Sequence, residues 1–218
     1  MKGKFYGVSV GPGDPELITI KAVKTIESCP VIAAPKTPGG STLALDIASS
    51  AVDLRGKTVI TPEFAMSGDR EKTRKSHLLA AEEICSYLER ELDVAMVNLG
   101  DVSVYSTFSH MEELVRERGF ASERIAGVTS FCAAAAAAGI NLTKGGLPLH
   151  ILPWRYAPRY AEEEGMKVIM KPGDVGSVKR AFAGRGAVAV SNCGLGNEKI
   201  ERLEEVGDCG YFTLVISE

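Results

Sequence analysis

Residues 7–19 read Gly-Val-Ser-Val-Gly-Pro-Gly-Asp-Pro-Glu-Leu-Ile-Thr, and they continue an apolar run that predicts the first strand. The triplet Gly11-Pro12-Gly13 is a tight turn that ends this strand and begins a helix. Glycines in such a turn let the backbone approach a ligand at the carboxyl edge of a parallel sheet. The identity of that ligand decides the function of the chain.

Length and composition describe an ordinary folded protein. The chain has 218 residues, 45% hydrophobic and 24% charged, which is enough for one large domain or two small ones. The formal net charge of −3 disfavours general nucleic-acid binding, which needs a basic surface. Five cysteines without a CxxC pair are typical of reduced thiols in a cytosol. The three histidines are scattered along the chain, so we expect no metal site.

Membrane association is not predicted. The N-terminal residues run directly into the first predicted strand, which leaves no room for a signal peptide. The longest apolar run, residues 131–140, is rich in alanine and about half as long as a membrane span. We therefore expect a cytoplasmic protein with neither a nucleic-acid nor a membrane partner.

Strand-like and helix-like segments alternate over residues 1–142. Strands are predicted over residues 5–10, 31–34, 58–61, 94–99 and 124–126, and helices over residues 17–28, 41–51, 70–92, 103–118 and 129–138. Because most of these strands are apolar throughout, they predict a mostly parallel sheet.

The pattern changes near Gly139, and residues 143–148 have the composition of a linker. Further strands are predicted over residues 149–152, 167–170, 187–191 and 211–217, with a helix over 175–183 and a turn near 158–164. The sequence thus predicts a two-domain α/β fold. Residues 1–142 form a domain with a mostly parallel sheet, and residues 143–218 a smaller α/β domain with a mixed sheet.

Three predicted strands end in glycine followed by small polar residues. The segments are Gly11-Pro12-Gly13-Asp14, Gly100-Asp101-Val102-Ser103 and Gly127-Val128-Thr129-Ser130. Each segment alone is as consistent with a turn and a helix cap as with a site. The carboxyl ends of parallel strands lie along one edge, where a single ligand can contact all three segments.

This edge lacks the features of a phosphate-binding site. A dinucleotide fingerprint needs a third glycine where Glu16 stands, and no convincing acidic residue follows about 20 residues later, which excludes an NAD-dependent dehydrogenase. The GxxxxGK[ST] phosphate loop is also absent from the sequence. The edge therefore suits a ligand with ribose, adenine and little or no phosphate.

The same segments resemble the motifs of the tetrapyrrole methylase family, whose members use S-adenosylmethionine as methyl donor. Residues 9–19 match the family's opening GxGPGDPxL[IL]T, with serine in place of the first glycine. In the second motif Val102 replaces a proline, and in the third Ala126 does so. The resemblance covers the whole chain. Residues 99–109, 127–134 and 192–194 are most similar to the branch that methylates C(20) of precorrin-2 or cobalt-precorrin-2 in cobalamin biosynthesis.

The resemblance implies a cofactor site in a cleft between the two domains. The implied contacts are Pro12, Leu99, Gly100, Asp101, Val104, Thr129 and Ser130 in the first domain, and Met170, Ala187 and Thr213 in the second. Met170 and Ala187 are almost as consistent with ordinary core packing. Asp101 is the strongest candidate, because a carboxylate there suits the recognition of a hydroxyl or an ammonium group.

Methyl transfer from a sulfonium requires alignment of donor and acceptor, which alone supplies roughly 7–11 kcal/mol of the barrier. A base or water then takes a proton from the ring, and Asp101 and Tyr105 are the candidate catalytic bases. The acid arms of a tetrapyrrole need cations. The candidate substrate contacts are Lys36, Lys144, Arg155 and Arg159, together with Asp14. For each of these cations a solvated surface charge is the alternative interpretation.

Two alternatives to this function stay open. The first is a methylase of the same family that acts on another ring carbon or on a modified histidine of a translation factor. The second is a catalytically silent module that binds the cofactor or a tetrapyrrole, which only the lost prolines at positions 102 and 126 favour. The resemblance also implies a homodimer.

Overall fold

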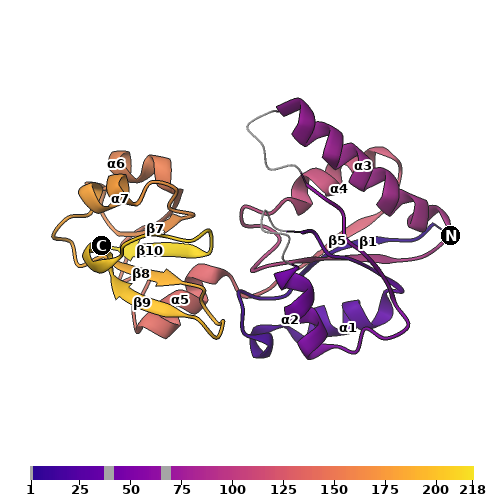
Figure 1. The fold of residues 1–218 in the computed structure, drawn as a ribbon, viewed down its shortest axis with the longest axis horizontal. Coiled ribbons are helices and arrows are strands. Elements are labelled where there is room, and N and C mark those ends of the chain that lie inside the picture. The colour runs from indigo at the N-terminus through magenta and orange to yellow at the C-terminus, as the bar shows by residue number, and fades with distance from the viewer. Residues whose placement is uncertain (1, 37–41, 65–69) are drawn as a thin grey trace. The chain divides into compact units, whose positions relative to one another are not determined.

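The computed structural model describes residues 2–36, 42–64 and 70–218. The chain separates into two compact units, Met1–Thr129 and Ser130–Glu218 (Figure 1). The sequence places the boundary later, after residue 142. The difference is helix α5 (Ser130–Ala138), which packs against strand β8 (Val188–Ser191) of the second unit.

The first unit contains a five-stranded sheet in the order β3-β2-β4-β1-β5, and every pairing in it is parallel. Its strands are β1 (Phe5–Ser9), β2 (Val31–Ala33), β3 (Thr58–Ile60), β4 (Val94–Asn98) and β5 (Ser122–Ile125). Its helices are η1 (Pro15–Leu17), α1 (Ile20–Ser28), α2 (Leu43–Ala51), α3 (Arg70–Glu89) and α4 (Phe108–Glu117). Ser41, the predicted start of the second helix, lies outside the described residues.

Helices cover both faces of this sheet, with α3 and α4 on one face and α1 and α2 on the other (Figure 1). Successive strand residues point to opposite faces. Phe5 and Met96 therefore pack in the core beneath α3 and α4, whereas Val8 and Val97 pack in the core beneath α1 and α2. Apolar residues from the strands fill both cores, which explains why the central strands read as continuous apolar runs.

The second unit contains a mixed five-stranded sheet in the order β6-β7-β10-β8-β9. Strands β6 and β7 are parallel, and the other pairings are antiparallel. The remaining strands are β6 (Leu149–Pro153), β7 (Met166–Met170), β9 (Lys199–Arg202) and β10 (Thr213–Ser217). The remaining helices are η2 (Trp154–Tyr156), α6 (Ala157–Tyr160), α7 (Val175–Ala181) and η3 (Leu203–Glu205).

The predicted α/β fold class is confirmed, with one parallel sheet and one mixed sheet. Strand β9 was not predicted, because it is a largely exposed edge strand without an apolar run. The helix predicted from residue 103 begins only at Phe108. The Asp101 carboxylate accepts a hydrogen bond from the Ser103 amide and holds the preceding residues in a turn. In the part of the chain that the structure describes, no helix is long and apolar enough to cross a membrane.

Candidate functional site

The carboxyl ends of β4, β1 and β5 lie side by side, because β1 pairs in parallel with both of its neighbours. Three loops continue from these ends: residues 9–14, 99–107 and 126–129. We call these three segments the rim. All three belong to the first unit, so the structure brings the glycine-bearing segments together at one edge of one sheet.

Two glycines join the first loop of the rim to the second. The Gly11 amide donates to the Gly100 carbonyl at 3.3 Å, and the Gly100 amide donates to the Gly11 carbonyl at 2.7 Å. Their φ angles are 82° and 70°, in the left-handed region where a side chain is strained. Glycine is therefore required at both positions of this crossing.

The Asp101 carboxylate joins the second loop to the third. One of its oxygens accepts from the Gly127 amide at 2.7 Å, and the other accepts from the Ser103 amide at 2.8 Å and from the Ser103 hydroxyl. The side chain is only 7% exposed. Burial raises the pKa of Asp101, but the hydrogen bonds from Ser103, Gly127 and Ser9 outweigh it and leave the pKa below its ordinary value. The group is therefore ionised at neutral pH.

Ser9 braces the same crossing from the end of β1. Its hydroxyl oxygen accepts a hydrogen bond from the Val102 amide at 3.0 Å, and the residue is fully buried. Ser9 also packs closely against the third loop, because a Cβ added to Gly127 would lie 2.4 Å from the Ser9 Cβ. The three loops thus interlock, with no space for a side chain at Gly127.

The second loop is also tied to its own strand and to the helix that follows it. The Ser106 hydroxyl donates to the buried Asn98 side chain at 3.0 Å and accepts from the Phe108 amide at 3.1 Å, at the start of α4. Sequence analysis missed both Ser9 and Asn98. Each is a polar residue at the last position of an otherwise apolar strand, and that position is the signal that identifies them.

The predicted cofactor contacts of the first unit all lie in the rim. Pro12 and Gly100 are buried, and Leu99, Val104 and Thr129 are partly buried; Ser130, the first residue of α5, belongs to the second unit. The predicted base Tyr105 is 48% exposed and has a φ of 47°. A side chain in this left-handed region stores strain, which proteins retain mostly at functional positions.

The structure does not bring the three predicted contacts of the second unit together. Met170 and Thr213 lie at the same end of neighbouring strands in the second sheet, where Met170 pairs with Leu214 and Thr213 pairs with Ser191. Ala187 precedes β8, which runs antiparallel to β10. It therefore lies at the opposite end of these strands from Thr213. It is fully buried, and its carbonyl accepts from the Leu203 amide at 2.9 Å. The antiparallel register is the reason for this separation.

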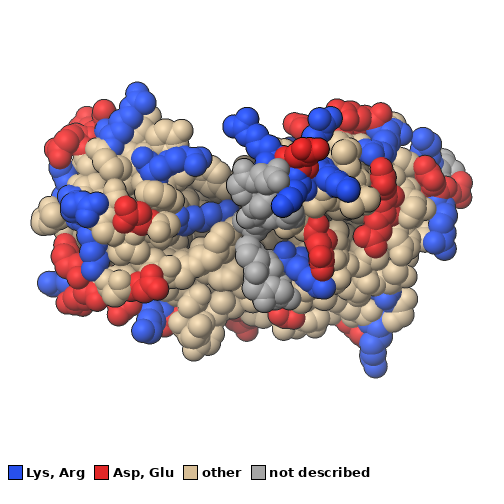
Figure 2. Space-filling view, turned by 45° about the horizontal axis from the view of Figure 1, so that its top comes forward, with Lys and Arg blue, Asp and Glu red and all other residues tan. Residues whose placement is uncertain are grey.

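The predicted substrate contacts have local partners. Lys36 lies 3.6 Å from Glu63 and Lys144 lies 3.8 Å from Glu218, while Asp14 caps η1 through the Glu16 amide. The Arg155 and Arg159 guanidiniums lie over the rings of Tyr156 and Tyr160, each at 5.7 Å. Lys36 and Asp14 belong to the first unit and the other three to the second. On the face shown in Figure 2, basic and acidic side chains are interspersed.

The rim suits a cationic ligand that carries no phosphate. Its three segments contain no lysine or arginine, and their buried carboxylate is ionised. Glycine at positions 11, 100 and 127 lets the three loops pack closely against one another. Among the described residues, no group of three or more histidine, cysteine, aspartate or glutamate side chains could hold a metal ion. These features fit a sulfonium nucleoside better than a nucleotide.

Comparisons with known proteins agree with this arrangement. The family described as tetrapyrrole (corrin/porphyrin) methylases matches residues 4–206. The probable cobalt-precorrin-2 C(20)-methyltransferase of Methanocaldococcus jannaschii is 36% identical over 170 residues, which are 77% of this chain and 72% of that protein. The precorrin-2 C(20)-methyltransferase of a Sinorhizobium species is 30% identical over 233 residues, covering 98% and 94%.

The fold also has a solved relative. The structure of uroporphyrin-III C-methyl transferase from Thermus thermophilus, complexed with S-adenyl homocysteine, superimposes with a TM-score of 0.72 at 20% identity. The match covers 99% of this chain and 98% of that one. At this level of identity the likeness shows a shared fold.

Proposed function

The chain belongs to the tetrapyrrole methylase family, and from this premise we propose that it is an S-adenosylmethionine-dependent methyltransferase acting on C(20) of precorrin-2 or cobalt-precorrin-2. Two relatives with that activity in their names, 36% and 30% identical, support the choice of acceptor. The observation that carries the proposal is the rim, where three loops interlock around the buried, ionised Asp101.

When bound, S-adenosylmethionine supplies a methyl group on a positively charged sulfur. The chain holds the donor by shape and by charge. Gly11, Gly100 and Gly127 let the three loops pack closely against one another, which fixes the shape of the rim. Pro12, Leu99 and Val104 supply its apolar side chains. Thr129 and Ser130 supply hydroxyls, and Met170 and Thr213 are the remaining proposed contacts from the second unit. A fixed donor geometry is what in-line methyl transfer needs most.

Asp101 positions the loops of the rim and does not act as the base that removes the ring proton. Both carboxylate oxygens already accept hydrogen bonds from the chain, and the lowered pKa makes the group a weak base at neutral pH. Solvent water receives the proton that the ring loses after methylation, either directly or through the Tyr105 hydroxyl, which would pass its own proton to water as it accepts the one from the ring. No covalent intermediate with the protein is required, because the sulfonium is already an activated methyl donor.

Four cations, Lys36, Lys144, Arg155 and Arg159, are proposed to meet the acid arms of the substrate, with Asp14 nearby. All four are exposed, so a carboxylate can reach them without breaking a buried contact. We further propose a homodimer that works in the cytoplasm.

The test is methyl transfer from isotope-labelled S-adenosylmethionine to metal-free and to cobalt-loaded precorrin-2. We expect one labelled methyl at C(20), located by mass spectrometry and carbon NMR. Precorrin-4 and a modified histidine of a translation factor serve as alternative acceptors. A methyl on one of these, or at another ring carbon, contradicts the proposed acceptor. Tight cofactor binding without turnover of any acceptor identifies a silent binding module.

A further inference from the structure

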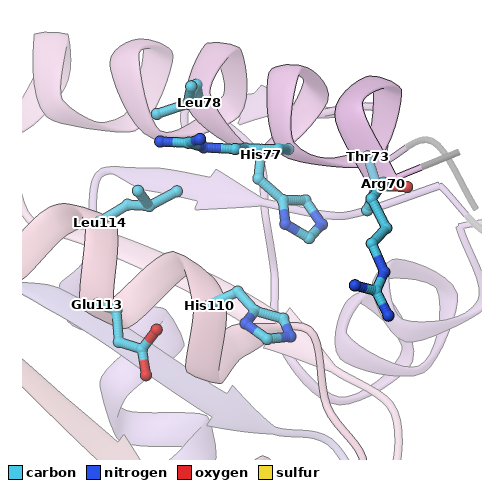
Figure 3. A pocket seen from close by; sticks show the side chains of 8 residues that line it. Arg70, Thr73, His77, Leu78, His110, Glu113 and Leu114 are labelled. Carbon is cyan, nitrogen blue, oxygen red and sulfur yellow. The ribbon is translucent and has the colours of Figure 1, made fainter.

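A second concave site lies outside the rim, between α3 and α4 of the first unit (Figure 3). Its charged and titratable lining comprises Arg70, Arg74 and His77 from α3, and His110 and Glu113 from α4. Thr73 and one leucine from each helix, Leu78 and Leu114, complete the lining. Two arginines against one glutamate leave the pocket positive even when both histidines are neutral.

The two imidazoles stack on each other in this pocket. Their ring centroids are 5.5 Å apart with an angle of 22° between the planes, and the edge of Phe64 meets His77 at 5.2 Å. Partial burial lowers the pKa of His77, and the nearby His110 lowers it further. Protonation of His77 is therefore costly until a negative charge arrives beside it.

The arginines of the pocket are available for a ligand. Among the residues that the structure describes, neither Arg70 nor Arg74 forms a salt bridge, and both side chains are exposed at the N-terminal end of α3. Figure 3 shows the Arg70 side chain extending from α3 toward the side of the pocket where His110 lies. Guanidinium groups bind carboxylates through two parallel hydrogen bonds, which gives them strength and direction.

The pocket adjoins the edge of the sheet that carries the rim. Helix α4 begins at Phe108, directly after the rim segment 99–107, and His110 lies in the first turn of that helix. Helix α3 likewise follows β3 at its carboxyl end. Both helices therefore start from the same edge of the parallel sheet, within one compact unit.

We propose that this α3–α4 pocket binds a carboxylate. The identity of the carboxylate rests on the proposed function: it is an acid arm of the tetrapyrrole, held by the Arg70 and Arg74 guanidiniums with His77 and His110 beside it. A free anion such as phosphate has the same chemistry and is the other possible source. An anion in the pocket also favours the protonated form of the partly buried His77. Glu113 repels the anion, but its single negative charge is smaller than the two positive charges of Arg70 and Arg74.

The test compares Arg70→Gln and Arg74→Gln with the matched control Arg90→Gln. Arg90 lies just beyond the other end of α3, with its guanidinium 5.7 Å from the Tyr87 ring. All three variants lose one positive charge. We expect each pocket variant to raise the KM for the tetrapyrrole about tenfold, as loss of one charged hydrogen bond predicts. The control should keep the KM of the wild type, and affinity for S-adenosylhomocysteine should be equal in all proteins.

A second measurement does not depend on turnover. The imidazole resonances of His77 and His110 in the wild-type protein are followed by NMR during titration with the tetrapyrrole, with sodium acetate and with inorganic phosphate. A raised histidine pKa with the tetrapyrrole supports the substrate arm. A shift with acetate or phosphate alone supports the pocket as a site for a free anion.

The outcomes separate the two proposals. If the wild type methylates no tetrapyrrole, the proposed function fails, and the NMR titration alone decides the pocket. If the imidazole signals respond to none of the three probes, the pocket proposal is overturned even when methylation is normal. Pocket variants with the same KM as Arg90→Gln exclude the substrate arm as the ligand.

Discussion

Replacing Asp101 by asparagine tests whether the rim depends on one carboxylate. The substitution preserves the size and shape of the side chain but exchanges one acceptor oxygen for an amide group that can only donate. In the structure both oxygens accept from backbone amides, one from Gly127 at 2.7 Å and the other from Ser103 at 2.8 Å. Whichever way the new amide turns, one backbone N–H group faces a donor.

The magnitude follows from these contacts. A hydrogen bond to a charged group contributes about 1.5–3 kcal/mol, and a buried donor left without a partner costs about 1–3 kcal/mol. The two figures describe one lost contact and do not add. Because Asp101 is only 7% exposed, water cannot readily replace the missing acceptor. We expect the free energy of unfolding of the first unit to fall by about 2–3 kcal/mol.

The effect has a defined pH dependence. Burial raises the pKa of Asp101, but the hydrogen bonds to its carboxylate lower it more, so the folded-state pKa lies below the unfolded-state value. A group of this kind stabilises the fold above the unfolded-state pKa, near 4, and its contribution is lost as the pH falls through the folded-state pKa. The difference between wild type and variant should therefore be complete at pH 7 and should shrink below about pH 4.

Urea unfolding at pH 7 and at pH 3.5, with calorimetric titration of S-adenosylhomocysteine at pH 7, measures both consequences. The matched control is Asp53→Asn in the same unit, where an exposed carboxylate accepts from the neighbouring Arg55. Its effect should be much smaller than that of Asp101→Asn, because exposed ion pairs contribute little to stability. The reasoning is refuted if Asp101→Asn matches this control in stability and binds the cofactor product as tightly as the wild type.

Two further predictions concern packing. Gly127→Ala should lower the free energy of unfolding by about 1–3 kcal/mol, because the new Cβ would lie 2.4 Å from the Ser9 Cβ. Gly146→Ala, with no atom within 4 Å of the added Cβ, should leave the thermal midpoint unchanged, and equal midpoints for the two variants would contradict the interlocked rim. Burial raises the pKa of Cys29 to about 12, whereas Cys132 is exposed. Iodoacetamide should therefore label Cys132 in the native protein and Cys29 only after unfolding, as peptide mass spectrometry would show; native labelling of both at one rate would argue against this burial.

The sequence predicted most of the elements because their signals are local. Apolar strands buried on both faces indicated the parallel sheet, and the turn Gly11-Pro12-Gly13 marked its carboxyl edge. Strand β9 escaped prediction since an exposed edge strand needs no apolar pattern. The onset of α4 was placed too early because the turn at Asp101 is also held by the Gly127 amide, 26 positions away, which the local sequence does not reveal.

For the candidate site, too, the sequence indicated some features and the tertiary structure decided others. By itself, the sequence determined which residue types stand at the strand ends, and those motifs were sufficient to indicate a phosphate-free ligand and a family. Only the tertiary structure decided what each group does there. Ser9 meets Val102 across 93 positions and Asp101 meets Gly127 across 26, because β1 pairs between β4 and β5. A carboxylate can bind a ligand, take a proton or brace a loop, and the donors that already occupy its oxygens determine which of these it does.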